Sequence, residues 1–244
     1  MNDPGCRFAV HYQPIVDLNG GQVIGFEALM RLRGEDGTVS SPEGVIEEIE
    51  KDLDALTDLI RELLAAVLRD AAPLFGRYPD FYVSVNIPPA VLGSGRLKPV
   101  IEELNLMPHV KRLVVEVTER QSLTDLGRMA LKMAREHGIR TAVDDFGTGH
   151  SGIEQIAGLD FDILKIDRSL IRPALTDRFS ARMLRGIVAL ASVLHVRTIA
   201  EGVETWEEAF FTKAAGVDYG QGWYWSKALP PEAIEDVLAK GIFP

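Results

Sequence analysis

The sequence predicts an α/β fold, a TIM-like (β/α)8 barrel with an initial β-hairpin that makes one strand antiparallel. Candidate strands alternate with candidate helices along the chain, which is typical of a parallel sheet. Eight candidate strands occur within 244 residues, close to the size of such a barrel. No linker rich in Pro, Gly or Ser divides the chain, so residues 1–244 are expected to form a single domain. An open, doubly wound sheet is the alternative.

The initial hairpin is expected from two apolar segments separated by a glycine-rich turn. Residues 8–16 are rich in β-formers, and Pro14 favours an edge or terminal strand. Residues 22–32 form the second segment. It contains Glu27 and Arg31, whose spacing of four places both on one face of a strand. Taken alone, the two charges are equally compatible with a local ion pair or with solvated edge positions.

The later elements follow from hydrophobic periodicity and from capping residues. Apolar residues recur at helical spacing from residue 43 to about 75, with a break near 51–52. The further candidate strands cover residues 81–86, 112–117, 141–145, 161–167, 196–200 and 217–222. The further candidate helices cover residues 99–104, 124–137, 151–157, 177–194, 207–215 and 230–240.

Composition restricts the classes of protein to which the chain can belong. Apolar residues make up 46 % and charged residues 25 %, which is ordinary for a soluble globular protein. The formal net charge of −10 argues against binding of nucleic acid polymers. The single cysteine, Cys6, excludes an internal disulfide framework and fits a reducing compartment. No membrane-spanning run or signal-peptide pattern is present, so we expect a cytoplasmic domain without membrane contact.

Two adjacent carboxylates, Asp144 and Asp145, end one buried apolar run, and a turn with two glycines follows. Neighbouring anions at a strand end cost free energy unless a cation holds them. A divalent metal ion is one explanation, because hard cations prefer oxygen ligands. An Asx-type turn with both side chains solvated is the other. This stretch alone leaves both explanations open.

The wider pattern favours the metal explanation, because a barrel collects its functional residues at the C-terminal ends of its strands. The late positions of the strands supply one set of polar residues: Glu27, Asn86, Glu116, Asp144, Asp145, Lys165, Glu201 and Gln221. Five bare carboxylates in one mouth would repel each other strongly. Two divalent ions sharing a carboxylate would relieve this repulsion, and such pairs, about 3.5–4 Å apart, stabilise in-line phosphoryl displacement.

These residues resemble the motifs of the EAL-domain family of cyclic di-GMP phosphodiesterases. Glu27-Ala28-Leu29 followed by Arg31 is similar to the Glu-x-Leu-x-Arg signature of that family. Residues 144–149 resemble its most specific motif. Further matching stretches occur in the family's order at residues 12–16, 83–86, 116–119, 165–167, 201–204 and 221–222. The resemblance therefore covers nearly the whole chain.

The resemblance implies hydrolysis of cyclic di-GMP to linear 5'-pGpG in bacterial second-messenger signalling. It implies two divalent metal ions, Mg²⁺ or Mn²⁺. Their ligands would be the positions Glu27, Asn86, Glu116, Asp144, Asp145 and Glu201. Glu201 would also be the general base, and Lys165 would help to hold the attacking water molecule.

The resemblance also implies contacts around these ligands. Arg31 would bind a substrate phosphate, because a guanidinium fork suits phosphate oxygens. Further substrate contacts would be Gln13, Leu29 and Gln221. Glu119 would brace the loop after Asp145, which lies at a dimer interface in the family, so a homodimer is expected. Glu204 and Asp167 would support the loops behind the site.

The sequence departs from the family pattern in two places. His150-Ser151-Gly152 stands where Tyr-Ser-Ser is usual, which bears on dimer coupling and not on the metal ligands. Residues 50–55 replace a glycine-containing turn and could reshape one edge of the guanine pocket. Trp223-Tyr224-Trp225 is compatible both with stacking on a guanine and with packing in the barrel wall.

Three functions remain distinct at this level: an active phosphodiesterase, a catalytically weak cyclic di-GMP receptor, and an interaction module that binds no nucleotide. Degenerate family members lose ligand carboxylates or the base, whereas this chain keeps both. Retention of Arg31 and Lys165 argues against the interaction module. Such domains often follow sensory or cyclase domains, so the chain could be the cytoplasmic part of a larger sensor protein.

Overall fold

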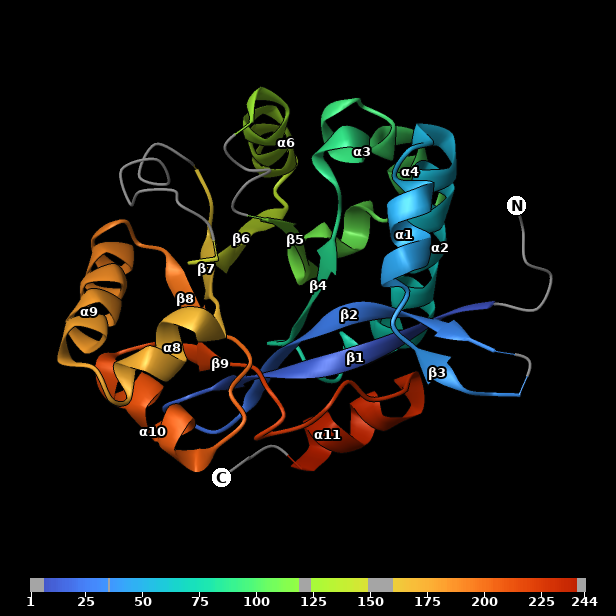
Figure 1. The fold of residues 1–244 in the computed structure, drawn as a ribbon. Coiled ribbons are helices and arrows are strands. Elements are labelled where there is room, and N and C mark those ends of the chain that lie inside the picture. The colour runs from blue at the N-terminus through green and yellow to red at the C-terminus, as the bar shows by residue number, and fades with distance from the viewer. Residues whose placement is uncertain (1–6, 35, 119–123, 149–159, 241–244) are drawn as a thin grey trace.

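The computed structural model describes residues 7–34, 36–118, 124–148 and 160–240, and within them eight strands close into a ring (Figure 1). The strands of the ring are β1 (Arg7–Asp17), β2 (Val23–Arg33), β4 (Tyr82–Asn86), β5 (Leu113–Thr118), β6 (Arg140–Phe146), β7 (Ile163–Ile166), β8 (Arg197–Ala200) and β9 (Tyr219–Gly220). A further short strand, β3 (Val39–Ser40), pairs with β2 outside the ring.

The pairing pattern confirms the predicted barrel and excludes the open sheet. β1 runs antiparallel to both of its neighbours, β2 and β9. Every other neighbouring pair in the ring is parallel. The tight β1–β2 hairpin causes the reversal, because a short turn can join only antiparallel strands.

Pro14 lies in β1, which is the first strand of the chain but pairs on both sides as part of the ring, so the expected edge position does not hold. Tyr12 exchanges backbone hydrogen bonds with Leu229, on the side of β1 away from β2. Backbone groups alternate in direction along a strand, so the N–H that Pro14 lacks would face this same side. On that side β9 pairs with β1 only at Val16 and Asp17. The proline is tolerated because it falls where the ladder to β9 is interrupted.

Helices surround the ring. The α-helices are α1 (Glu43–Ile49), α2 (Leu53–Ala71), α3 (Pro89–Gly93), α4 (Leu97–Glu103), α6 (Asp125–Glu136), α8 (Arg168–Ala174), α9 (Arg178–Val193), α10 (Trp206–Ala215) and α11 (Ile234–Lys240). Short 3₁₀ segments are η1 (Ala72–Leu74), η2 (Met107–Arg112) and η3 (Pro231–Ala233). Within the described residues, no helix has the length and apolar character needed to cross a membrane.

The helix boundaries follow local capping chemistry. The predicted break near residues 51–52 is present, because the carboxylate of Asp52 accepts the backbone N–H groups of Asp54 and Ala55 and starts α2 anew. The short helices α3 and α8 were not predicted, since five to seven residues show no clear helical period. The helix expected at residues 151–157 lies outside the described part of the chain.

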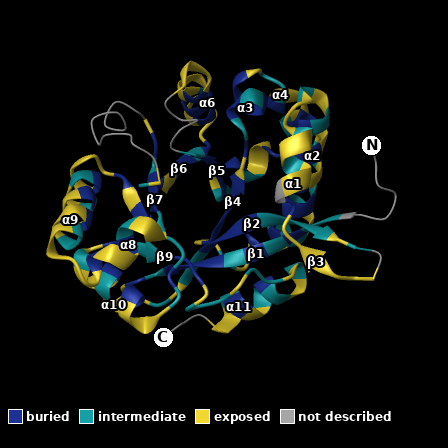
Figure 2. Ribbon diagram, viewed as in Figure 1, coloured by how far each residue is buried: buried dark blue, intermediate teal, exposed yellow. Residues whose placement is uncertain are grey.

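Apolar packing fills both the wall and the interior of the barrel. The strands of the ring are largely buried, while β3 and the outer faces of the helices are exposed (Figure 2). One large cluster packs the β1–β2 hairpin, β4 and β5 against α2 and its neighbours, and a second packs β6–β8 against α8, α9 and α10. A third forms a layer across the barrel and comprises Ile15, Tyr82, Val114, Ala142, Ile163 and Ile199.

Tyr12→Phe is expected to destabilise the fold by about 1.5–3 kcal/mol, the usual net value of a hydrogen bond to a charged group. The fully buried hydroxyl group of Tyr12 donates to Oδ2 of Asp70 at 2.9 Å and links β1 to α2. Urea unfolding followed by circular dichroism measures the change.

Tyr82→Phe is the matched control, because the buried hydroxyl of Tyr82 has no hydrogen-bond partner among the described residues. Its removal should leave stability unchanged or slightly increased. Equal unfolding free energies for the two variants would contradict a stabilising Tyr12–Asp70 bond.

Candidate active site

The polar residues at the barrel mouth lie on the same inward-facing side of the strands as the apolar residues of the barrel interior. Side chains alternate along a strand, so residues two apart share a face. In four strands the inward apolar residue of the third cluster is followed two positions later by an ionisable residue. These pairs are Val114 and Glu116, Ala142 and Asp144, Ile163 and Lys165, and Ile199 and Glu201. A dry apolar layer therefore forms the floor of a charged site.

Lys165 lies at the centre of this site and is fully buried. Its Nζ contacts four carboxylates: Glu116 at 2.6 Å, Glu201 at 2.8 Å, Asp144 at 3.2 Å and Glu27 at 3.5 Å. Burial alone would lower the pKa of Lys165, but these carboxylates raise the pKa well above its ordinary value. The lysine is therefore a permanent cation.

One ammonium group cannot neutralise all of these acids. Burial raises the pKa of Glu116 to about 8, although Lys165 opposes the shift. Burial likewise raises the pKa of Glu201 well above its ordinary value. Burial would raise the pKa of Asp144 too, but Lys165 and hydrogen bonds bring it below its ordinary value. The site thus favours additional positive charge, supplied either by protons or by cations.

The carboxylates fall into two groups that share one member. One oxygen from each of Glu27, Glu116 and Asp144 lies within 4.8 Å of the others, and the same holds for Asp144, Asp145 and Glu201. Glu116 Oε1 is buried and has no hydrogen-bond partner within the described residues. An all-oxygen donor set with an unsatisfied carboxylate oxygen fits a hard divalent cation.

Asp145 reaches this site through an unusual backbone conformation. Its φ angle is +59°, a left-handed value that few residues other than glycine adopt. Its backbone N–H donates to Oδ1 of Asp144 at 2.8 Å. Gly147, with φ of +109°, then passes so close to Leu170 that a Cβ would collide. Because Asp144 is only 9 % exposed, the solvated-turn explanation does not hold for it.

Two amide side chains orient Glu27, and a third supports one of them. Asn86 Nδ2 donates to Glu27 Oε1 at 3.0 Å, and Gln221 Nε2 donates to Glu27 Oε2 at 2.6 Å. Gln221 Nε2 also reaches Oε1 of Gln13 at 3.2 Å. Gln13 in turn donates to the backbone carbonyl of Ser226. The predicted metal ligand Glu27 and the predicted substrate contacts Gln13 and Gln221 therefore form one connected group.

Arg31 and Leu29 lie farther along the same face of β2, at the edge of the carboxylate cluster. Both are half-buried. The Arg31 guanidinium donates to its neighbouring carbonyl, that of Met30, at 2.8 Å. Burial lowers the pKa of Arg31, and the charge of Glu27 opposes that shift. The guanidinium remains a cation beside the site, since the ordinary arginine pKa is far above neutrality.

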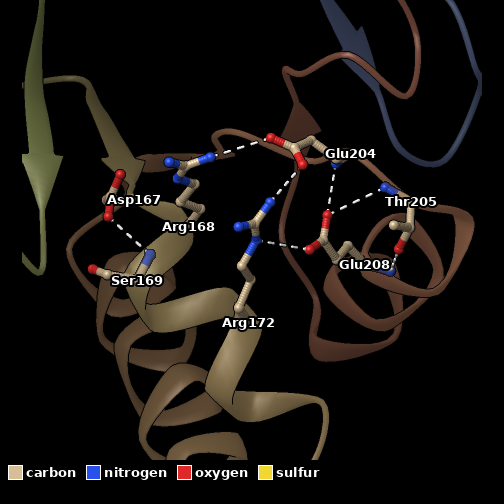
Figure 3. A network of polar contacts seen from close by, with 7 residues as sticks. All are labelled: Asp167, Arg168, Ser169, Arg172, Glu204, Thr205 and Glu208. Atoms are coloured by element: carbon tan, nitrogen blue, oxygen red, sulfur yellow. Dashed lines mark hydrogen bonds and ion pairs between the residues drawn. The ribbon is translucent and has the colours of Figure 1, made fainter.

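The predicted supporting residues Asp167 and Glu204 belong to a network behind the site (Figure 3). Asp167 caps α8 by accepting the Ser169 N–H at 2.8 Å. Glu204 accepts from Arg168 at 3.1 Å and from Arg172 at 2.6 Å. Glu119 lies outside the described residues, as does most of the loop proposed for dimer contact, so both expectations stay predictions.

Sequence reasoning overlooked Arg172 and Glu208. Arg172 Nε donates to Glu208 Oε1 at 3.2 Å. A signal for Glu208 was present, because Thr205-x-x-Glu208 has the spacing of a helix capping box, and that box is formed. No local pattern pointed to Arg172.

The three aromatic residues 223–225 differ in their surroundings, which bears on the two expected roles, packing in the barrel wall and stacking on a guanine. Tyr224 and Trp225 pack against the second apolar cluster and are part of the barrel wall. Trp223 is 62 % exposed, and Nζ of Lys227 lies 4.9 Å from its ring centroid. Stacking on a guanine stays a prediction for Trp223 alone.

Lys165→Met is expected to destabilise the metal-free protein by about 3–5 kcal/mol, because it leaves buried carboxylates without their cation. Addition of Mg²⁺ or Mn²⁺ should restore part of the loss. Chemical unfolding with and without metal measures both effects. Lys213→Met, at an exposed position of α10, is the control. Equal stability of the two variants without metal would show that Lys165 does not hold the cluster.

Comparison with known proteins identifies relatives that match most of the chain. The family model described as EAL domain matches residues 4–228. The probable cyclic di-GMP phosphodiesterase PdeN of Escherichia coli is 36 % identical over 244 residues, which is 98 % of this chain and 46 % of PdeN. The probable cyclic di-GMP phosphodiesterase PdeB of the same organism is 34 % identical over 227 residues, 91 % of this chain and 43 % of PdeB. The chain thus spans less than half the length of either relative.

The fold also matches solved structures. The PaMucR phosphodiesterase in complex with c-di-GMP superposes with a TM-score of 0.82 and 28 % sequence identity, covering 93 % of this chain and 94 % of that one. The matched segment, residues 4–228, contains every candidate site residue named above. Because the family model covers well over half of the sequence, the protein belongs to the EAL domain family.

Proposed function

We propose that the protein is a metal-dependent phosphodiesterase that hydrolyses cyclic di-GMP to linear 5'-pGpG in bacterial second-messenger signalling. The observation that carries the proposal is the convergence of four carboxylates on one fully buried lysine at the barrel mouth. Several relatives are named cyclic di-GMP phosphodiesterases, which supports the choice of substrate.

The proposed cofactors are two divalent ions, Mg²⁺ or Mn²⁺. Their proposed ligands are Glu27, Asn86, Glu116, Asp144, Asp145 and Glu201, with Asp144 common to the two carboxylate groups. The Asn86 amide nitrogen already donates to Glu27, so its oxygen remains available as a ligand. Bound divalent ions would lower the pKa of a water molecule and neutralise negative charge on the reacting phosphate.

Glu201 and Lys165 are the proposed catalytic residues. The Glu201 carboxylate accepts a proton from the attacking water molecule as its oxygen forms a bond to phosphorus. The bond between phosphorus and the 3' oxygen breaks, a solvent water molecule protonates the 3' oxygen, and a 5' phosphate remains. Lys165 lies 2.8 Å from Glu201, so it can orient the base and hold the water molecule.

Substrate binding is assigned to the hairpin beside the cluster. The guanidinium group of Arg31 binds a substrate phosphate, since its planar fork matches the spacing of phosphate oxygens. The further proposed contacts are Gln13, Leu29 and Gln221. The glutamines form a hydrogen bond with each other, so they present one pre-oriented polar edge to the ligand.

Incubation with cyclic di-GMP and Mg²⁺ or Mn²⁺, followed by chromatography, tests the function. We expect linear pGpG, and no product when a chelator removes the metal. Binding without hydrolysis would instead identify a catalytically weak cyclic di-GMP receptor. Absence of both would identify an interaction module. Cyclic di-AMP serves as the control for selectivity toward guanine.

Glu201→Gln is expected to lower turnover by at least about 100-fold, the lower range of general base contributions. Binding of cyclic di-GMP should persist, because the substitution preserves shape. Product chromatography and isothermal titration calorimetry measure the two quantities separately. Glu207→Gln, at an exposed position of α10, should leave both unchanged. Full turnover in the Glu201 variant would refute its assignment as the base.

A further inference from the structure

The segment that follows β8 carries the proposed base and is fixed along its backbone. We name residues 201–205 the Glu201 loop. The Glu201 N–H donates to the Ile166 carbonyl at 2.9 Å, and the Val203 N–H donates to the Gln221 carbonyl at 3.1 Å. The Glu204 and Thr205 N–H groups have no backbone partner among the described residues and donate to a side chain instead.

That side chain belongs to Glu208. Its Oε2 accepts the N–H of Glu204 at 2.6 Å and the N–H of Thr205 at 3.2 Å (Figure 3). The Glu208 side chain is only 6 % exposed. A neutral glutamine would suffice for a capping box, whereas a buried carboxylate needs a cation. The Glu208 carboxylate therefore needs a positively charged partner in addition to the backbone N–H groups that it caps.

Arg172 supplies the cation from a different helix. Its Nε lies 3.2 Å from Glu208 Oε1, and its Nη2 lies 2.6 Å from Glu204 Oε2. One guanidinium group thus spans two carboxylates, of which one is buried. An exposed ion pair would contribute little, but a fork shared by two acids also fixes their relative orientation.

The contact joins α8 to α10, the helices that follow the two proposed catalytic residues along the chain. α8 begins directly after Asp167, two residues beyond Lys165, and the Glu201 loop leads into α10. The loop is pressed against α8, because Gly202 has φ of +61° and a Cβ there would lie 2.9 Å from Cδ of Arg168. Movement of α8 relative to α10 would therefore change the Lys165–Glu201 geometry.

We propose that Arg172 and Glu208 are positioning residues, which hold the Glu201 loop so that Glu201 faces Lys165. The inference rests on the proposed function, because it assigns these two residues to the orientation of its base. Neither residue contacts the carboxylate cluster, so their effect passes through the loop backbone.

The test compares Arg172→Gln with Arg172→Lys in the full chain. Arg172→Gln is expected to lower kcat for cyclic di-GMP about 10- to 100-fold with KM unchanged, because small misplacement of a catalytic group is costly. Arg172→Lys should recover part of kcat, since an ammonium group can contact one carboxylate but not two. Glu208→Gln, which keeps the cap, should also lower kcat with KM unchanged.

Arg197→Gln is the matched control. Arg197 also pairs with a carboxylate, Asp218, at 2.6 Å, but at the opposite end of β8. Arg197→Gln should lower the melting temperature no more than Arg172→Gln does, and it should keep wild-type kcat. An equal loss of kcat in the two variants, or none in Arg172→Gln, would overturn the proposal.

Amide hydrogen exchange of the metal-free protein separates this inference from the proposed function. Arg172→Gln should accelerate exchange at Glu204 and Thr205, whereas Arg197→Gln should not. If the wild-type protein does not hydrolyse cyclic di-GMP, the proposed function fails, and the exchange rates still decide whether Arg172 holds the loop. Unchanged exchange in Arg172→Gln would refute the positioning role.

Discussion

The buried ammonium group of Lys165 is the interaction on which the barrel mouth depends. It contacts carboxylates from β2, β5 and β6 and the one that follows β8. These elements are far apart in the chain, so the contacts exist only when the ring is closed and in register. Removing several charges from water is costly, and the apolar layer beneath the site supplies packing that offsets part of this cost.

The same cluster explains why the site suits metal chemistry. Burial is the main reason that the pKa values of Glu116 and Glu201 are raised, and neighbouring carboxylates, which a single positive charge leaves under-neutralised, add to the rise. A site of this kind is unfavourable for stability and favourable for cation binding, a combination that functional sites often show. The buried Oε1 of Glu116, which has no hydrogen-bond partner among the described residues, is one atom at which this shortage of positive charge is visible.

Behind the cluster, neighbouring loops are held by side chains as well as by the sheet. The ladder between β7 and β8 ends near Ile166 and Ala200, and beyond that point side chains of α8 and α10 add to the few backbone hydrogen bonds that hold the Glu201 loop. Glu208 and Arg172 extend the connection past the last strand pairing. Rigid support of this kind keeps reactive groups oriented before substrate binds.

Local patterns in the chain were enough to predict the barrel, most helices and the residues that meet at its mouth. Those inferences depend on local periodicity and on strand ends, and parallel strands bring their ends to one rim. The short helices α3 and α8 were missed, because so few residues carry no periodic signal. The place of Pro14 inside the ring could not be read locally either, since it depends on where the β9 ladder is interrupted.

The contacts between side chains could be identified only from the folded barrel. Lys165 is predicted as a helper but lies at the centre of the cluster, because four separate elements aim their carboxylates at it. Arg172 and Glu208 are 36 positions apart and lie on two different helices. The sequence of neither helix contains a pattern from which the contact with the other could be predicted. Capping and periodicity are encoded locally, whereas side-chain contacts between elements arise only when the closed ring sets their distances.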